Sequence, residues 1–132
     1  MREMFNECNS LRILDVSHFN TSKVTDIGHM FRCCGAVEKL DVANWDISNV
    51  MSLYSTFHKC LKLKSLDLSK WNTGNVNNTG EMFSFCYELT TIGDVSNWNT
   101  GKLTNTLAMF YDCSNLKSLP VHLPNNLIGP KY

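Results

Sequence analysis

Six cysteines are the side chains of this 132-residue chain best suited to bind a metal or to form disulfides. Five of them recur at almost constant spacing: Cys8, Cys34, Cys60, Cys86 and Cys113. Metal sites favour close pairs such as C-x-x-C, which the sequence lacks, and five cysteines in one row cannot all pair with one another. We therefore predict buried free thiols, no metal site and no cofactor, with Cys33 as the most exposed thiol.

A second row consists of aspartates, each placed inside an apolar stretch: Asp15, Asp41, Asp67 and Asp94. If the repeats stack, these carboxylates become neighbours of like charge and repel one another. Two explanations remain open. Backbone amides and the hydroxyls of Ser17, Ser69 and Ser96 offset the repulsion, or a cation or a basic ligand does so from outside.

A third row is aromatic, with Phe19, Trp45, Trp71 and Trp98 at equivalent positions. These rings form either a stacking platform for sugars or a packed corner of the fold, and we favour packing. The histidines, by contrast, fall at different places in the repeat: His18, His29, His58 and His122. We find no set of nucleophile, base and orienting group, and we expect no enzyme activity.

All three rows follow one internal repeat. A pair ending in phenylalanine recurs at Phe5, Phe31, Phe57, Phe83 and Phe110, so the spacings are 26, 26, 26 and 27 residues. The additional residue is Gly93, which suits a one-residue bulge. We assign 1–119 to a repeat domain with units starting near 4, 30, 56, 82 and 109. The proline-rich segment 120–132 is assigned to a C-terminal cap or tail.

One unit reads as a short strand, a turn and a short helix. In the first unit, Leu14 and Val16 alternate with Asp15 and Ser17, as in a strand with one buried face. After the turn, apolar residues recur at helical spacing: Val24, Ile27, Met30, Phe31 and Cys34. Stacked strands lie about 4.8 Å apart and packed helices about 8–10 Å apart. We therefore predict an α/β solenoid of about five rungs that is curved, with a parallel sheet on its concave face.

The motif M-F-x-x-C-x-x-L-x-x-L-D-[VL]-S-x-[WF]-[ND]-T-[SG] closely resembles the 26-residue BspA-like leucine-rich repeats of bacterial surface proteins and mycoplasma lipoproteins. The resemblance covers residues 4–119. It implies an extracellular repeat array, and some members of the family act as adhesins for host matrix proteins. The chain departs from ordinary leucine-rich repeats where those carry an asparagine, because aromatic residues occupy that position here.

Composition excludes several classes of partner. The formal net charge is zero, so the sequence predicts no nucleic-acid binding. No apolar run approaches about 20 residues, so we expect no membrane insertion. The first ten residues, MREMFNECNS, lack the apolar core of a signal peptide. A location at the cell surface or outside the cell therefore rests on the resemblance alone.

Our leading hypothesis is a non-enzymatic module for protein recognition or adhesion, which binds a protein partner on its concave face. The predicted ligand-binding residues are Asp15, Ser17, Lys39, Asp41, Ser65, Asp67, Ser69, Asp94 and Ser96. Neighbouring positions in the same rows are Ile13, His18, Ala43, Asn44, Lys70, Thr91 and Asn97. The alternatives are a carbohydrate-binding module that uses the tryptophan row and a structural spacer within a longer surface protein. An uncapped N-terminal rung further predicts end-to-end self-association.

Overall fold

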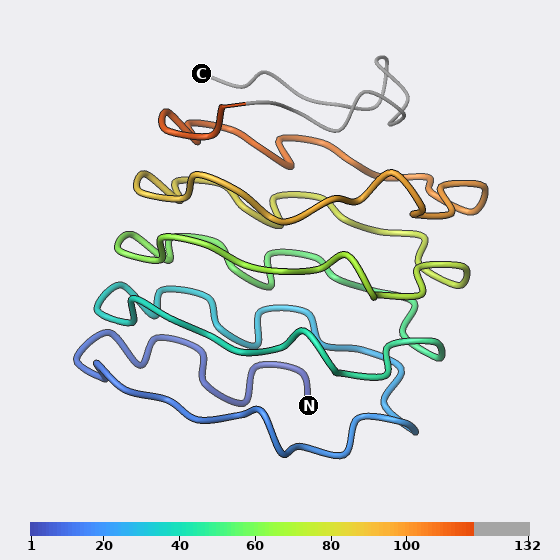
Figure 1. Cartoon of the computed structure of the whole chain (residues 1–132), viewed down its shortest axis with the longest axis horizontal. Helices are drawn as coiled ribbons and strands as arrows, with labels where there is room; N and C mark the ends of the chain where they lie inside the picture. Colours follow the sequence, from blue (N-terminus) through green and yellow to red (C-terminus); the bar gives the residue numbers. More distant parts are fainter. Residues whose placement is uncertain (118–132) are drawn as a thin grey trace.

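The chain winds into a solenoid of stacked rungs, as the repeat predicts (Figure 1). The computed structural model describes residues 1–117. The predicted cap or tail at 120–132 and the last two residues of the predicted repeat domain lie outside the described residues. The N-terminus lies at one end of the stack, so the first rung has a neighbour on one side only among the described residues (Figure 1).

Neighbouring rungs are joined by two columns of parallel backbone bridges. One column consists of Lys39, Ser65 and Thr91, and the other of Asp26, Ser52, Asn78 and Asn105. Within residues 1–117 the backbone forms no helix and no strand longer than a single bridged residue. The parallel pairing agrees with the prediction, but each rung contributes isolated bridges and not continuous strands.

The segment that we expected to be a short helix is a series of tight turns, so that expectation is wrong. In the second rung, amides donate to carbonyls three residues earlier: Met30 to Ile27, Arg32 to His29, and Cys34 to Phe31. His29 and Cys33 have φ values of 56° and 62°, in the left-handed region. The equivalent residues of the later rungs also have positive φ values. A right-handed helix cannot continue through left-handed residues four positions apart.

The remaining amides of this segment join one rung to the next. Residues 29, 31 and 33 donate to the carbonyls of Tyr54, Thr56 and His58 at 2.8–2.9 Å. The rungs are therefore held at hydrogen-bonding distance on this side as well. Our reason for expecting a concave sheet was the wider spacing of helices, and that reason no longer applies. We use the name strand face for the surface formed by 11–17, 37–43, 63–69 and 89–96.

Equivalent side chains lie above one another in the core. The five repeated phenylalanines form one stack, with 5.5–5.8 Å between ring centroids. The thiols of Cys34, Cys60, Cys86 and Cys113 each donate to a phenylalanine carbonyl of the previous rung at 2.9–3.2 Å. Each rung thus buries its apolar side chains against its neighbours, which explains why one unit alone would be unstable.

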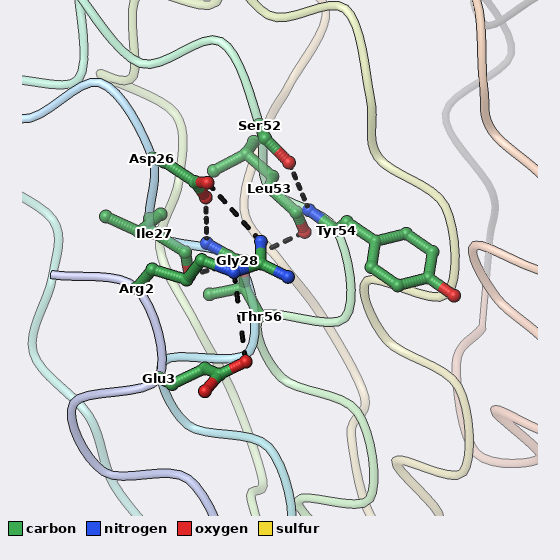
Figure 2. Close-up of polar contacts among 9 residues, drawn as sticks. All are labelled: Arg2, Glu3, Asp26, Ile27, Gly28, Ser52, Leu53, Tyr54 and Thr56. Atoms are coloured by element: carbon green, nitrogen blue, oxygen red, sulfur yellow. Dashed lines mark hydrogen bonds and ion pairs between the residues drawn. The ribbon is translucent and has the colours of Figure 1, made fainter.

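Short polar side chains turn the corners of each rung. Oδ1 of Asn20 accepts the amide of Ser22 at 3.1 Å, as a turn-forming asparagine does. At another corner, Oδ1 of Asp26 accepts the amide of Gly28 at 2.7 Å (Figure 2). Nη1 of Arg2 reaches Oδ2 of the same aspartate at 3.3 Å, so this corner also joins the first rung to the second (Figure 2).

Gly93 accommodates the extra residue of the fourth unit, as predicted. Its φ is 88°, and a Cβ atom there would lie 2.7 Å from Oδ1 of Asp67. The bridge between Ser65 and Thr91 persists beside it. Glycine therefore absorbs the insertion without breaking the stacking of the third and fourth rungs.

Candidate functional site

The aspartate row is exposed on the strand face, and one oxygen of each carboxylate is used by its own rung. Oδ1 of Asp15 accepts the amide of Ser17 at 3.1 Å and its hydroxyl at 2.7 Å. Ser69 bonds Asp67 in the same way at 3.1 and 2.6 Å. The amide of Ser96 donates to Oδ1 of Asp94 at 3.0 Å. These contacts support the structural explanation for Oδ1.

The serine contacts also favour the charged form of the carboxylates. The hydroxyl and then the amide of Ser17 hold the pKa of Asp15 below its usual value, and Ser69 has the same effect on the pKa of Asp67. Asp41 has a different environment because alanine replaces the serine. Within residues 1–117, its carboxylate accepts one hydrogen bond, from the amide of Ala43 at 3.3 Å. Asp41 is therefore the aspartate of the row that its own rung holds most weakly.

The second oxygens of three aspartates face solvent. Within residues 1–117, no donor bonds Oδ2 of Asp15, Asp41 or Asp67. All three residues are exposed. An ionised oxygen with free lone pairs can accept hydrogen bonds from a partner without disturbing the corner that Oδ1 stabilises.

A depression of about 460 Å³ lies on the strand face across the second, third and fourth rungs. Its lining includes Lys39, Asp41, Ser65, Asp67, Thr91 and Gly93. A neighbouring depression of about 330 Å³ is lined in part by Arg12, Asp15, Glu38, Lys39 and Asp41. Lys39 and Asp41 belong to both, so the two depressions adjoin. Both signs of charge are present in this part of the strand face, so it can complement a partner that carries both signs.

The structure brings together some of the predicted ligand-binding residues. Lys39, Asp41, Ser65 and Asp67 share one depression, and Asp15 lies in the adjoining one. Ser17 and Ser69 instead donate their hydroxyls to aspartates, and neither they nor Asp94 and Ser96 line these depressions.

Sequence reasoning missed two charged residues of the site, Arg12 and Glu38. They occupy equivalent positions directly after the first leucine or valine of each unit. Lys64 is the next residue of this row, and its Nζ lies 3.9 Å from Oε1 of Glu38. Comparing charges at equivalent positions of the repeat would have revealed the row before the structure did.

The tryptophan row is buried, as our preferred packing interpretation predicts. Trp45, Trp71 and Trp98 are 4%, 3% and 6% exposed. Each Nε1 donates to a carbonyl of the previous rung: Trp45 to Val16, Trp71 to Val42, and Trp98 to Leu68, at 2.9–3.1 Å. No ring face of these residues is open to a sugar, so the carbohydrate-binding alternative loses its proposed platform.

The cysteines form no disulfide within residues 1–117. Cys34, Cys60, Cys86 and Cys113 are buried, whereas Cys8 and Cys33 are partly exposed. Burial raises the pKa of the Cys34 thiol to about 11 and raises the pKa of Cys60 and Cys86 well above 9.0. Such thiols remain protonated and behave as small apolar side chains.

One group of reactive side chains meets on the side of the solenoid formed by the tight turns, which we call the turn side. Its geometry is not that of a nucleophile and its base. His58 is 8% exposed, and its Nδ1 lies 3.6 Å from Oε2 of Glu81. Ser55 donates to the same Oε2 at 3.3 Å and not to the imidazole. In the described part of the chain, no three His, Cys, Asp or Glu side chains converge as a metal site would require. The same part contains no helix capable of spanning a membrane.

Comparison with protein families gives one match that covers most of the chain. The model described as "Mycoplasma protein of unknown function, DUF285" matches residues 1–121. No curated protein matches the chain significantly. The family match agrees with the resemblance inferred from the 26-residue motif, which is thereby confirmed.

A solved structure of a leucine-rich protein has a similar fold, and two others match with lower TM-scores. A leucine-rich cell surface protein from Faecalibacterium prausnitzii matches with a TM-score of 0.51 and 18% identity, over 89% of this chain and 34% of that one. A leucine-rich repeat protein from Bacteroides ovatus has a TM-score of 0.46 and 20% identity, over 91% and 34% of the two chains. A leucine-rich repeat protein from T. pallidum has a TM-score of 0.40 and 17% identity, over 87% of this chain and 58% of that one. The chain thus spans about a third of the length of two of these proteins.

Proposed function

Because the chain belongs to the DUF285 family and has a leucine-rich repeat fold, we propose that it is a non-enzymatic module that recognises a protein partner through its strand face. One observation carries the proposal. The adjoining depressions present Lys39, the free Oδ2 atoms of Asp41 and Asp67, and the hydroxyls of Ser65 and Thr91 from three rungs. Among the described residues, the Thr91 hydroxyl accepts the amide of Gly93 at 3.0 Å and keeps its own hydrogen to donate, whereas the fold bonds none of the other groups, so all of them are available to a ligand.

The partner that fits best is a polypeptide segment with donors and at least one acidic group. Carboxylate oxygens accept hydrogen bonds from basic side chains or amides of the partner. No described carboxylate lies within ion-pair distance of Lys39, so its ammonium group can pair with an acidic residue of the partner. Complementary charges of this kind contribute more to specificity than to raw affinity.

The proposal includes a location at the cell surface or outside the cell. It is supported by the description of the similar protein from F. prausnitzii as a leucine-rich cell surface protein. Adhesion to host matrix proteins is the finer form of the proposal, and it rests on the family resemblance. In the alternative function, a structural spacer, no residue of the strand face is specialised for a ligand.

The test is selection of binding peptides from a displayed library of random short peptides, with the 132-residue chain as the target. Selected peptides are then measured against Asp41→Asn and against Asp46→Asn as the matched control. Asp46 is also exposed, and its Oδ1 accepts the amide of Ser48 at 3.0 Å at a different corner. At both positions asparagine keeps one oxygen to accept the backbone amide, removes the charge and replaces the free oxygen with an NH2 donor.

We expect the selected peptides to bind the wild type and Asp46→Asn equally and to bind Asp41→Asn at least about tenfold more weakly, the typical effect of a lost charged contact of about 1.4 kcal/mol. Equal binding to Asp41→Asn would place recognition elsewhere on the molecule. Enrichment of no peptide at all would favour the spacer.

A further inference from the structure

Charges of opposite sign lie in two separate rows on the strand face. The aspartate row places one exposed carboxylate on each of the first three rungs: Asp15, Asp41 and Asp67. A second row, which we call the basic row, places one exposed cation on each of the same rungs: Arg12, Lys39 and Lys64. In each rung the two rows are separated by about 7–10 Å of extended chain. Both rows run along the side of the solenoid, and neither depends on an end of the stack.

The charged groups of these rows have little to bind within their own chain. Within residues 1–117, Arg12 and Lys39 form no ion pair, and Nζ of Lys64 lies 3.9 Å from Oε1 of Glu38. An exposed pair such as the last contributes little to stability, so a partner can replace it. As described above, Oδ2 of each of the three aspartates accepts no described hydrogen bond.

The strand face is complementary in charge to itself. A two-fold axis parallel to the stack turns one strand face onto another, so that the basic row of each copy faces the aspartate row of the other. The rungs keep their order, so Lys39 of one copy faces Asp41 of the other, and the first and third rungs pair in the same way. A two-fold axis along the rungs would instead set each row against itself and bring like charges together.

The first rung adds an exposed apolar side chain between the two rows. Ile13 is 85% exposed and lines the same depression as Arg12 and Asp15. A facing copy would cover this side chain and remove apolar area from water, which favours association. The tight turns also hold neighbouring rungs at hydrogen-bonding distance, so the stack curves little and two strand faces can meet over several rungs (Figure 1).

We propose that the partner recognised by the strand face is a second copy of this chain, paired face to face about a two-fold axis parallel to the stack. This inference rests on the proposed function, because it names the partner of the same surface. The two copies use the same surface, so the contact closes at the dimer. It consists of exposed ion pairs on a few rungs, so the dimer is weak.

The experiment is sedimentation equilibrium of the full 132-residue chain at concentrations up to about 1 mM, which a weak contact requires. We expect the mass to rise to twice the 15.0 kDa of the monomer and to level off there. Added salt should weaken the association, because it screens exposed ion pairs. A wild type that is monomeric at every concentration would overturn the proposal, as would a mass that rises beyond the dimer.

Charge reversal on one rung tests which rows face one another. Lys39→Glu and Asp41→Lys each bring like charges together twice in the dimer, so each variant alone should associate at least about tenfold more weakly than the wild type. An equimolar mixture of the two variants should regain the association of the wild type, because each reversed residue then faces an opposite charge. Lys23→Glu is the matched control, since Lys23 is exposed but lies outside the strand face, and it should associate as the wild type does.

Two results with these variants would contradict the paired rows. One is an equal loss of association in Lys23→Glu and Lys39→Glu, and the other is a mixture that associates no better than its components. Peptide selection separates this inference from the proposed function. Selected peptides that require Asp41, found together with a wild type that stays monomeric, would overturn the second copy as partner and leave the proposed function standing.

Discussion

Replacing Trp71 with phenylalanine removes a buried hydrogen bond between two rungs. Nε1 of Trp71 donates to the carbonyl of Val42 at 2.9 Å, and the side chain is 3% exposed. The same carbonyl also accepts the amide of Trp45 at 3.1 Å, so the substitution does not leave it without a donor. The change therefore isolates the indole bond and the larger ring.

The expected loss of stability follows from these two contributions. A buried hydrogen bond contributes about 1 kcal/mol net, and the smaller ring leaves a space that costs about 1 kcal/mol more. We expect Trp71→Phe to reduce the free energy of unfolding by about 2 kcal/mol. The measurement is urea unfolding followed by circular dichroism, with the slope m compared between variants.

The first rung provides the matched control. Phe19 occupies the same position in the repeat, is partly exposed, and stacks on Trp45 at 6.1 Å. Within the described residues there is no earlier rung whose carbonyl could accept an indole N–H at this position. Phe19→Trp should therefore change stability by less than about 0.5 kcal/mol. Our reasoning would be refuted if Phe19→Trp stabilised the protein by about 2 kcal/mol, or if Trp71→Phe left stability unchanged.

Two further predictions concern the turn side and the bulge. Burial, opposed by Glu81, lowers the pKa of His58 below its ordinary 6.5, so the unfolded chain binds this proton more readily. Neutral His58 contributes fully to the free energy of unfolding above about pH 6.5, and this contribution is lost as the pH falls through the lowered pKa. His58→Gln should therefore make the free energy of unfolding, measured with urea, depend less on pH between about pH 7 and pH 5. A pH profile identical to that of the wild type would contradict this prediction. Gly93→Ala should cost about 1–2 kcal/mol, because φ is 88° and the new Cβ would lie 2.7 Å from Oδ1 of Asp67. Gly35→Ala is the control, because its Cβ would make only ordinary contacts with Leu61, at 3.5 Å or more. Equal melting temperatures for Gly93→Ala and Gly35→Ala would argue against the bulge geometry at Gly93.

Much of the fold was predictable because every rung repeats the same demands. Residues such as Phe57 and Cys60 recur in register, and side chains in register must lie above one another once the units stack. The same logic predicted the burial of Trp71 and the role of Gly93 as the inserted residue. The candidate site was predicted in part, since Lys39 and Asp41 were identified and their charged neighbours Arg12 and Glu38 were not.

The helix was predicted wrongly because two structures share one apolar pattern. Ile27, Met30 and Phe31 point inward in a series of tight turns as they would in a helix. Within residues 1–117, ten residues other than glycine have positive φ, and most of them, such as Lys59 and Phe85, are of types that rarely adopt that conformation. The hydrogen bonds that stabilise it join rungs 26 residues apart, so no local property of the sequence records them.

The sequence by itself determined the repeat length, the inward-facing rows and the polar corners, because each of these depends on residue type and spacing within one unit. Only the tertiary structure decided that the backbone would turn and not coil, that the indoles would bond to the preceding rung, and that Oδ2 of Asp41 and Asp67 would have no donor within residues 1–117. The physical reason is that a rung meets its hydrogen-bonding needs through its neighbours, and the neighbours exist only after the chain has stacked.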